Sequence, residues 1–409
     1  DEPIRSFAKA TSFWFKVGCP GFGGPAGQIA LMHRLVVDER KWVGEAQFLH
    51  ALNFCMLLPG PEAQQLATYI GWLLHGVRGG LVAGILFVLP GFCVILALSA
   101  AYAAFGQLPW LMGVFFGLKC AVIALVAEAL WRVAKRSLKQ PTHVVVAVLA
   151  FLALFVFRVP FPIVILAAAL VGFGMARGSD GTALNGGNEK ILEQSSSAPR
   201  PVRTVVIGAV LWLGPIALLA LLFGGDQIFP QMGLFFAKMA VVTFGGAYAV
   251  LAYVAQQAVQ NYGWLSTGNM IDGLALAETT PGPLILVLSF VGFYAAHQQH
   301  GALAPMLAGT LGAVFVTWVT FVPSFIWIFL GAPYVERLRK NRYLSAALAM
   351  VTAAVVGVIA NLALWFALHV LFARGAVVET GPLRLQWPDP ASFDWRAGLI
   401  SVVALAMIF

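Results

Sequence analysis

Phe22-Gly23-Gly24-Pro25, read together with Leu58-Pro59-Gly60-Pro61, decides the fold of this 409-residue chain. The same pair of motifs returns as Phe244-Gly245-Gly246 and Thr280-Pro281-Gly282-Pro283. Gly60 follows Gly23 by 37 positions and Gly282 follows Gly245 by the same 37, so the copies lie 222 residues apart. Glycine and proline at these positions interrupt otherwise apolar helices. The sequence therefore predicts an internal duplication with two helix breaks in each copy.

Composition indicates the medium that surrounds the repeat. Hydrophobic residues make up 60% of the chain and charged residues only 10%, against about 25% charged residues in ordinary soluble proteins. Uncharged runs such as 79–110 are long enough to cross a hydrocarbon core that needs about 20 residues per helix. We expect an all-α polytopic membrane protein embedded in a lipid bilayer. The formal net charge of +8 then indicates basic cytoplasmic loops and no nucleic-acid partner.

Other classes of site find little support in the sequence. The four cysteines stand in apolar stretches without the spacing of a disulfide framework or a zinc site. His297 and His300 lack a third candidate ligand, so no metal is expected. A GxGxxA pattern at Gly21, Gly23 and Ala26 lacks the preceding strand that a nucleotide site requires. We therefore predict neither a cofactor nor enzymatic activity.

The order of apolar segments predicts two homologous halves. Residues 1–176 form an N-terminal repeat, 177–203 a cytoplasmic linker, 204–230 a connecting transmembrane helix and 231–409 a C-terminal repeat. In each half, two segments broken at Phe-Gly-Gly and Pro-Gly-Pro precede longer spans. The broken segments are predicted to be re-entrant half-helices, the alternative being that each forms a pair of full crossings. Past the breaks, the offset between copies becomes 233, as Pro90 and Pro323 show. Residues 374–396 are predicted to form a polar loop.

Basic residues predict that the halves are inverted. In the first half, Arg132, Lys135, Arg136 and Lys139 follow a long span, whereas in the second half the cations at 337, 339, 340 and 342 precede the equivalent span. Cations favour the cytoplasmic side, so the equivalent helices are predicted to run in opposite directions. The expected location is the inner membrane of a bacterium.

Inverted repeats with discontinuous helices are typical of secondary transporters, which bind substrate near the membrane midplane. Backbone N–H groups after Gly23-Gly24 and Gly245-Gly246 would favour an anion. Lys16 and Lys238 each lie seven residues before the first glycine of their pair, and a lysine in an apolar run is costly enough to indicate a function. The alternative is that the breaks only allow kinks and close helix packing.

The motifs also resemble a known family. Phe22 to Gln28, followed by Leu58-Pro59-Gly60-Pro61-Glu62-Ala63-Gln64-Gln65, is similar to the two-domain chromate ion transporters, and the resemblance covers both halves. It implies an inner-membrane exporter that expels chromate, uses the proton motive force and confers chromate resistance. Ala247 and Ala249, on either side of Tyr248, depart from the more glycine-rich second copy of the family.

Polar residues beside the breaks are the remaining candidates. The amides of Gln28, Asn53, Gln64 and Gln65 suit a tetrahedral oxyanion, although each could instead bond a neighbouring helix. Glu62 and Glu278 flank the two Pro-Gly-Pro breaks and are predicted to couple protons, the alternative being a structural acid at a helix N-terminus. Lys119 and Glu128, nine residues apart, are too poorly aligned to pair, and their roles stay open.

Alternatives to chromate export remain. Chromate and sulfate share their shape and charge, so a sulfate or other oxyanion transporter is one alternative and an anion channel is another. A membrane enzyme would need a nucleophile, metal or cofactor site. The expected partners are the anion, protons and lipid, and a homodimer is an open possibility.

Overall fold

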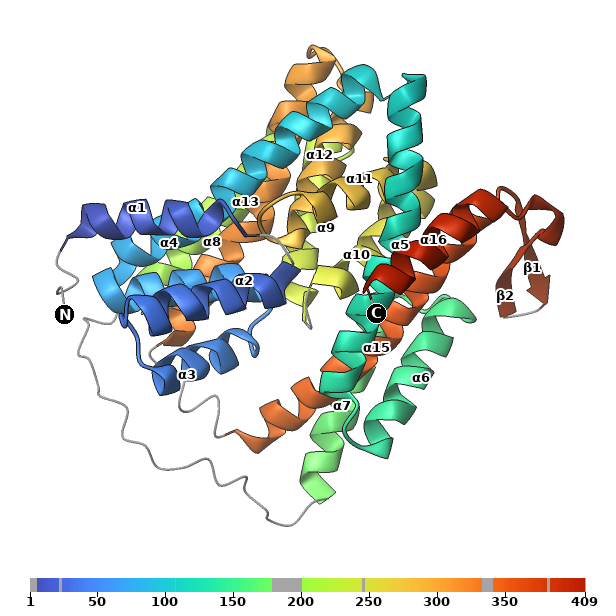
Figure 1. The fold of residues 1–409 in the computed structure, drawn as a ribbon. Helices are drawn as coiled ribbons and strands as arrows, with labels where there is room; N and C mark the ends of the chain where they lie inside the picture. Colours follow the sequence, from blue (N-terminus) through green and yellow to red (C-terminus); the bar gives the residue numbers. More distant parts are fainter. Residues whose placement is uncertain are drawn as a thin grey trace. The chain divides into compact units, whose positions relative to one another are not determined.

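A computed structural model describes residues 6–21, 24–106, 108–178, 201–244, 247–332, 341–380 and 383–408 (Figure 1). In this part of the chain, five helices are long and apolar enough to cross a membrane. They are α4 (Glu62–Phe105), α5 (Pro109–Ser137), α8 (Pro201–Phe223), α13 (Pro305–Gly331) and α15 (Arg342–Leu371). Most of the predicted linker, residues 179–200, lies outside the described residues.

Shorter helices make up much of the rest. They are α1 (Phe7–Gly18), α2 (Gly24–His33), α3 (Glu45–Cys55), α6 (Pro141–Phe155), α7 (Phe161–Gly178), α9 (Ile228–Val242), α10 (Ala247–Gln256), α11 (Thr267–Thr279), α12 (Val287–Gln298) and α16 (Trp395–Ile408). Two π-helical turns, η1 (Arg34–Glu39) and η2 (Gln257–Asn261), continue α2 and α10. A 3₁₀ turn, η3 (Leu284–Leu286), leads into α12.

The predicted breaks separate helices at all four positions. The chain leaves helical structure between α1 and α2 and between α3 and α4, and it does so again between α9 and α10 and between α11 and η3. Residues that lie 222 positions apart also have similar backbone angles. The φ angle of Gly60 is 120° and that of Gly282 is 103°, while Lys41 at 52° corresponds to Gly263 at 61°. The duplication is therefore visible in the backbone as well as in the sequence.

The copies differ in the length of the connection after the second break. In copy one, α4 consists of two helical pieces, because His75 and Gly76 have non-helical backbone angles. Gly76 has a φ of 63°, which glycine adopts without strain. In copy two, α12 ends at Gln298 and a turn precedes α13. Beyond this point the offset of 233 holds, because α5 begins at Pro109 and α15 at Arg342.

The chain forms two compact units, and each unit takes segments from both copies. One consists of Asp1–Ala101, Thr182–Gly246 and Leu276–Lys340, and the other of Tyr102–Gly181, Ala247–Ala275 and Asn341–Phe409. The boundaries predicted from the repeat, at 176, 203 and 230, divide the sequence rather than these spatial units, and they stay predictions.

In the first unit, tryptophan bonds hold α8 against α13. Trp212 Nε1 donates to the Val319 carbonyl at 2.9 Å, and Trp318 Nε1 donates to the Leu211 carbonyl at 2.8 Å. Pro323 and Pro215 stand four residues after these two carbonyls. A proline removes the N–H that would bond the carbonyl four residues earlier. Each helix thus has a carbonyl freed by its own proline and bonded by a tryptophan of the other helix.

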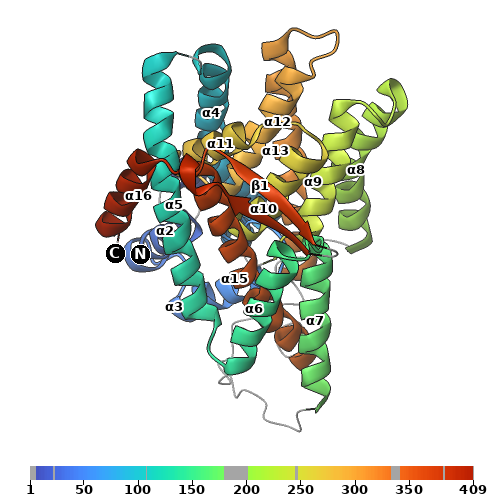
Figure 2. The same ribbon diagram turned by 90° about the vertical axis from the view of Figure 1, so that its right-hand side faces the viewer.

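In the second unit, α15 packs against α5, α6, α7 and α16, and Figure 2 shows α6 and α7 beside it. Small residues allow close approach, since a Cβ on Gly357 would lie 2.7 Å from the Phe151 nitrogen of α6 and one on Gly172 would lie 2.7 Å from Ala347 Cα. Small residues at helix contacts are typical of membrane bundles.

The predicted polar loop at 374–396 contains secondary structure, which corrects that prediction. Strands β1 (Gly375–Thr380) and β2 (Leu383–Pro388) pair antiparallel, with Gly375 opposite Pro388. A 3₁₀ turn, η5 (Pro390–Ser392), follows them. β-branched residues, among them Val377, Val378 and Thr380, favour strands, and the prediction considered only their polar neighbours.

The outer surfaces of the helices are apolar. Helix α8 has a mean hydropathy of 2.6, yet only 11% of its most apolar stretch is buried inside the protein. Leu221 and Leu222 on this helix are 84% and 65% exposed. Such surfaces are stable in a hydrocarbon environment. The protein is therefore a multi-pass membrane protein.

Candidate functional site

The two Pro-Gly-Pro turns are built so that only glycine fits their centres. Gly60 and Gly282 are buried and have positive φ angles. A Cβ on Gly60 would lie 2.8 Å from Gln65 Nε2 and 2.9 Å from Ser324 Oγ, and one on Gly282 would lie 3.1 Å from Gly91 Cα. The lack of a side chain lets other backbone segments come close.

Backbone hydrogen bonds connect the turns to the breaks of the opposite copy. The N–H of Gly60 donates to the Thr243 carbonyl at 2.9 Å, and the N–H of Gly282 donates to the Gly21 carbonyl at 3.0 Å. Because Gly60 corresponds to Gly282 and Gly21 to Thr243 at an offset of 222, the two bonds are equivalent. Each copy gives one donor and one acceptor, so the four breaks are joined in two equivalent pairs inside the first unit.

Close contacts between the copies repeat this exchange. Gly91 of α4 lies against Pro281 and Gly282, and Ser324 of α13 lies against Gly60. Gly91 and Ser324 correspond at the later offset of 233, and each follows a proline within its helix. Each Pro-Gly-Pro turn thus rests on the proline-containing helix of the other copy. We call this set the break centre; it comprises Gly21, Gly60, Gly91, Thr243, Gly282 and Ser324.

Three of the predicted amides lie buried beside the breaks. Gln28 is 1% exposed, and Gln64 and Gln65 are fully buried. Gln28 Nε2 donates to the Gly21 carbonyl at 3.0 Å, and Gln65 Nε2 donates to the Pro59 carbonyl at 2.7 Å. Gln64 Nε2 donates to Thr68 Oγ1 at 3.1 Å. Each bond uses one of the two N–H groups of the amide. Gln28 and Gln65 therefore brace the non-helical backbone at Gly21 and at Pro59.

Of the four glycines predicted to bind substrate, the structure describes Gly24. Gly24 begins α2 with a φ of 65°, and a Cβ there would meet no atom within 4 Å. Open space thus lies next to the first turn of α2. Gly23, Gly245 and Gly246 lie outside the described residues.

The predicted cations and the asparagine are at the surface. Lys16 of α1 and Lys238 of α9 occupy equivalent positions, and both side chains are exposed, as is that of Asn53 on α3. The structure does not bury them with the glutamines. Their role in binding stays a prediction.

The two predicted proton carriers adjoin the Pro-Gly-Pro turns. Glu62 is the first residue of α4, and Glu278 is the last but one residue of α11. Both are partly buried. The position of Glu62 also suits an acid that stabilises a helix N-terminus, so both interpretations of this residue remain.

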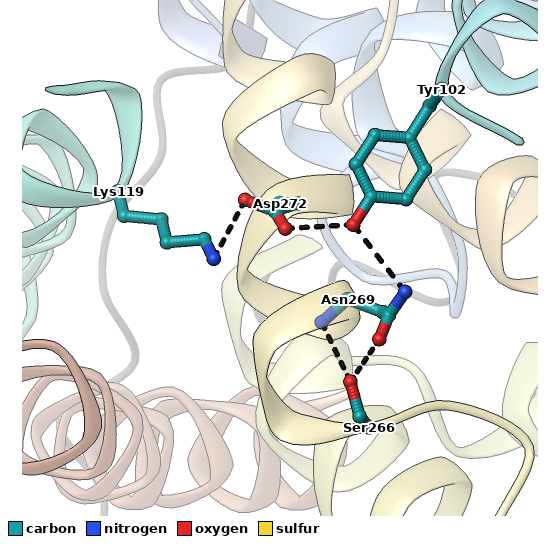
Figure 3. A network of polar contacts seen from close by, with 5 residues as sticks. All are labelled: Tyr102, Lys119, Ser266, Asn269 and Asp272. Atoms are coloured by element: carbon teal, nitrogen blue, oxygen red, sulfur yellow. Dashed lines mark hydrogen bonds and ion pairs between the residues drawn. The ribbon is translucent and has the colours of Figure 1, made fainter. Parts of the chain in front are cut away.

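A second polar cluster lies in the other compact unit (Figure 3). Lys119 Nζ of α5 is 3.1 Å from Asp272 Oδ1 of α11. Tyr102 OH donates to Asp272 Oδ2 at 2.8 Å, and Asn269 Nδ2 donates to Tyr102 OH at 3.4 Å. Ser266 Oγ bonds Asn269 Oδ1 and accepts from the Asn269 N–H. A buried carboxylate thus bonds to two different helices.

Sequence reasoning missed this cluster. It correctly separated Lys119 from Glu128, which pairs with Arg132 one turn further along α5. It did not single out Asp272 or Tyr102, although an acid within the apolar stretch of α11 is the signal that would have identified the site. Asp272 lies 153 residues from Lys119, so spacing within a helix could not connect them.

Long apolar helices, paired helix breaks and buried polar groups define the class as a membrane transporter rather than an enzyme. The chain belongs to the chromate transporter family, whose model matches residues 8–173 and 230–409. This confirms the resemblance seen in the Phe-Gly-Gly and Pro-Gly-Pro motifs.

Curated relatives agree with this assignment. A chromate transport protein of Pseudomonas aeruginosa is 32% identical over 87% of this chain and 80% of its own length. A chromate transport protein of Cupriavidus metallidurans is 29% identical over 87% of this chain and 82% of its own length. A probable chromate transport protein of Synechococcus elongatus is 28% identical over 88% of this chain and 84% of its own length. No solved structure matches the chain.

Proposed function

We propose that this protein is a secondary active transporter that exports chromate across the inner membrane of a bacterium and so confers chromate resistance. The observation that carries the proposal is the break centre, in which equivalent hydrogen bonds run from each copy to the other. Broken helices that meet at a repeat interface are the usual construction of a substrate site in such carriers. Chromate is the substrate named for the relatives.

The two copies are proposed to have inverted topology. Two equivalent bonds exchanged in both directions are what a two-fold axis between the copies would produce. The basic run after α5 and the basic run before α15 then lie on the same side of the membrane if that axis lies in the membrane plane. On this proposal the four broken segments are re-entrant.

The substrate is proposed to bind at the breaks. Open space at Gly24 adjoins the first turn of α2, where N–H groups carry a partial positive charge. The remaining N–H groups of Gln28, Gln64 and Gln65 would add donors, Gly23, Gly245 and Gly246 would add backbone N–H groups, and Asn53 would complete the set. Lys16 and Lys238 would supply the positive charge that a dianion needs in a poorly solvated site.

The export is proposed to be driven by the proton motive force. Protonation of Glu62 or Glu278 would let the empty carrier reorient without an unpaired carboxylate in the membrane. Glu62 directly follows Pro61 and Glu278 stands three residues before Pro281, so a change in their charge would act on the backbone of the turns.

Chromate uptake into everted membrane vesicles tests the proposal. Vesicles that contain the protein should accumulate chromate when energised, and vesicles from the same strain without it should not. Cells that express the protein should accumulate less chromate at matched exposure. Equal accumulation in cells with and without the protein would contradict chromate export.

Sulfate and an anion channel are the alternatives that the same vesicles distinguish. Strong inhibition by sulfate, with labelled sulfate taken up in its place, would favour a broader oxyanion transporter. A channel would conduct anions without any exchange of internal for external chromate.

A further inference from the structure

Lys119 is placed where a charge is costly. It lies ten residues after Pro109 in the 29-residue α5, which is about 15 Å along the helix axis and so about half the depth of a hydrocarbon core. A charged side chain at that depth is paired or functional. Asp272 is its partner at 3.1 Å.

The two members of the pair differ in exposure. The side chain of Asp272 is 7% exposed and that of Lys119 is 26% exposed. Asp272 is fixed by Tyr102 through its other oxygen, whereas an ammonium has three N–H donors in all. The Lys119 side chain is thus the more accessible member of the pair, while one carboxylate oxygen lies against its ammonium.

Gly268 adjoins Lys119. A Cβ on Gly268 would lie 3.8 Å from both Lys119 Nζ and Ser266 Oγ, which is ordinary van der Waals contact, so the glycine keeps the volume of a methyl group free next to the ammonium. Gly268 is in the first turn of α11. The surroundings therefore combine a cation, hydroxyl and amide groups, and a carboxylate already bound to the cation.

We infer that Lys119 is an oxyanion-binding residue and that Asp272 is an internal competitor, which holds the ammonium until the substrate oxyanion takes its place. The inference rests on the proposed function, because it takes the substrate to be a tetrahedral oxyanion. A carboxylate and an oxyanion such as chromate present the same kind of acceptor to an ammonium. The two therefore exclude one another at Lys119.

Competition makes binding depend on pH with a definite sign. A proton on Asp272 removes the negative charge of the competitor, so the oxyanion should bind more tightly as the pH falls, and binding should in turn favour protonation. In the described part of this unit, the charged or titratable groups that face Asp272 are Lys119 from α5 and Tyr102 from α4; Asn269 joins Tyr102 from α11 itself.

The direct test measures binding of chromate to the purified full-length protein over a range of pH. Wild-type protein should bind more tightly at lower pH. Asp272→Asn should bind chromate about tenfold more tightly than wild type at alkaline pH. It should also lose the part of the pH dependence of binding that arises from the protein rather than from chromate. Lys119→Gln should bind at least about tenfold more weakly. Chromate itself takes up a proton in mildly acidic solution, and that contribution is common to all variants.

Two further variants guard against loss of folding and against a purely structural role. The double variant Lys119→Gln with Asp272→Asn leaves no unpaired charge buried at this site. It should bind chromate weakly, without the pH dependence that the pair produces. Glu128→Gln removes a charge from the other ion pair of the same helix and should match wild type.

The outcomes separate the two proposals. If wild-type protein neither binds nor transports chromate, the proposed function fails. If wild-type protein binds chromate and the single or double variants at 119 and 272 bind it with the same affinity and pH dependence, the pair is structural and this inference alone is overturned.

Discussion

Gly60 and Gly282 hold backbone angles that residues with a side chain adopt only under strain. We predict that Gly60→Ala and Gly282→Ala each destabilise the protein by about 1–3 kcal/mol, because a Cβ would also press on Ser324 in one case and on Gly91 in the other. Thermal unfolding in detergent should show lower melting temperatures for both variants.

Gly113 provides the matched control. It lies in α5, and a Cβ there would meet no atom within 4 Å. Gly113→Ala should leave the melting temperature unchanged or raise it slightly, because alanine favours a helix. Wild-type stability in both turn variants would show that the left-handed angles are not required.

At the scale of single residues, the sequence predicted the breaks better than the polar contacts. Glycine and proline act on the backbone at their own position, so Gly60 and Gly282 could be identified from the motif alone. The contact of Asp272 with Lys119 depends on how distant helices pack. The exposed position of Lys16 likewise depends on which face of α1 is covered, and that is decided by the rest of the protein.

At the scale of helices, the tryptophan bonds between α8 and α13 predict a specific energetic coupling. Trp212→Phe should cost about 1–3 kcal/mol, because the Val319 carbonyl loses its donor. Pro323→Ala returns an N–H to the helix four residues after Val319. In the Pro323→Ala background, Trp212→Phe should therefore lower the free energy of unfolding by markedly less.

A double-mutant cycle of unfolding free energies measures this coupling. Trp131→Phe on α5 is the control, since that side chain is 62% exposed, and its effect should be independent of residue 323. Additive effects of Trp212→Phe and Pro323→Ala would mean that the tryptophan does not compensate for the proline.

For whole elements, apolar length predicted the long helices well, because a bilayer sets a minimum length that the sequence displays directly. The end of one helical segment near His75 and the start of the next near Gly79 were also predicted, and His75 and Gly76 indeed have non-helical backbone angles inside α4. The hairpin of β1 and β2 was missed because a polar stretch between spans was assumed to lack regular structure.

For the whole molecule, inverted topology predicts the labelling of single cysteines in a background without Cys19, Cys55, Cys93 and Cys120. Cysteines introduced at Lys139 and Asn341, both exposed in the structure, should be shielded from an impermeant external reagent in intact cells. A cysteine at Asn261, which is also exposed, should be labelled. Labelling at both basic positions would reject the inverted arrangement.

The proposed coupling to protons also belongs to the scale of the whole carrier. If Glu62 and Glu278 carry protons, Glu62→Gln and Glu278→Gln should reduce chromate export driven by a pH gradient and leave chromate exchange at equal pH intact. Proteoliposomes allow both measurements on the same preparation. Full pH-driven export in both single variants and in the double variant would remove the coupling role.

The repeat spacing predicted that the two Phe-Gly-Gly breaks would meet at one site, and this stays a prediction because Gly23, Gly245 and Gly246 lie outside the described residues. The hydrogen bonds of Gly60 and Gly282 instead join each Pro-Gly-Pro turn to the chain beside the Phe-Gly-Gly break of the other copy. The repeat spacing could not predict that each compact unit contains segments from both copies, because the offset between copies does not determine which helices pack together. That arrangement depends on contacts such as Gly91 with Gly282, which follow from shape rather than from spacing.

The pair of Lys119 and Asp272 occurs once, whereas the break centre occurs as two equal halves. The position equivalent to Lys119 is Thr352, which bonds the Leu348 carbonyl of its own helix, and the position equivalent to Asp272 is His50. In an alternating carrier with identical halves, the states open to either side would be related by symmetry and equal in free energy. On the proposed mechanism, a single ion pair would add to the difference between the halves, and the empty carrier would have a preferred resting side until chromate displaced the pair.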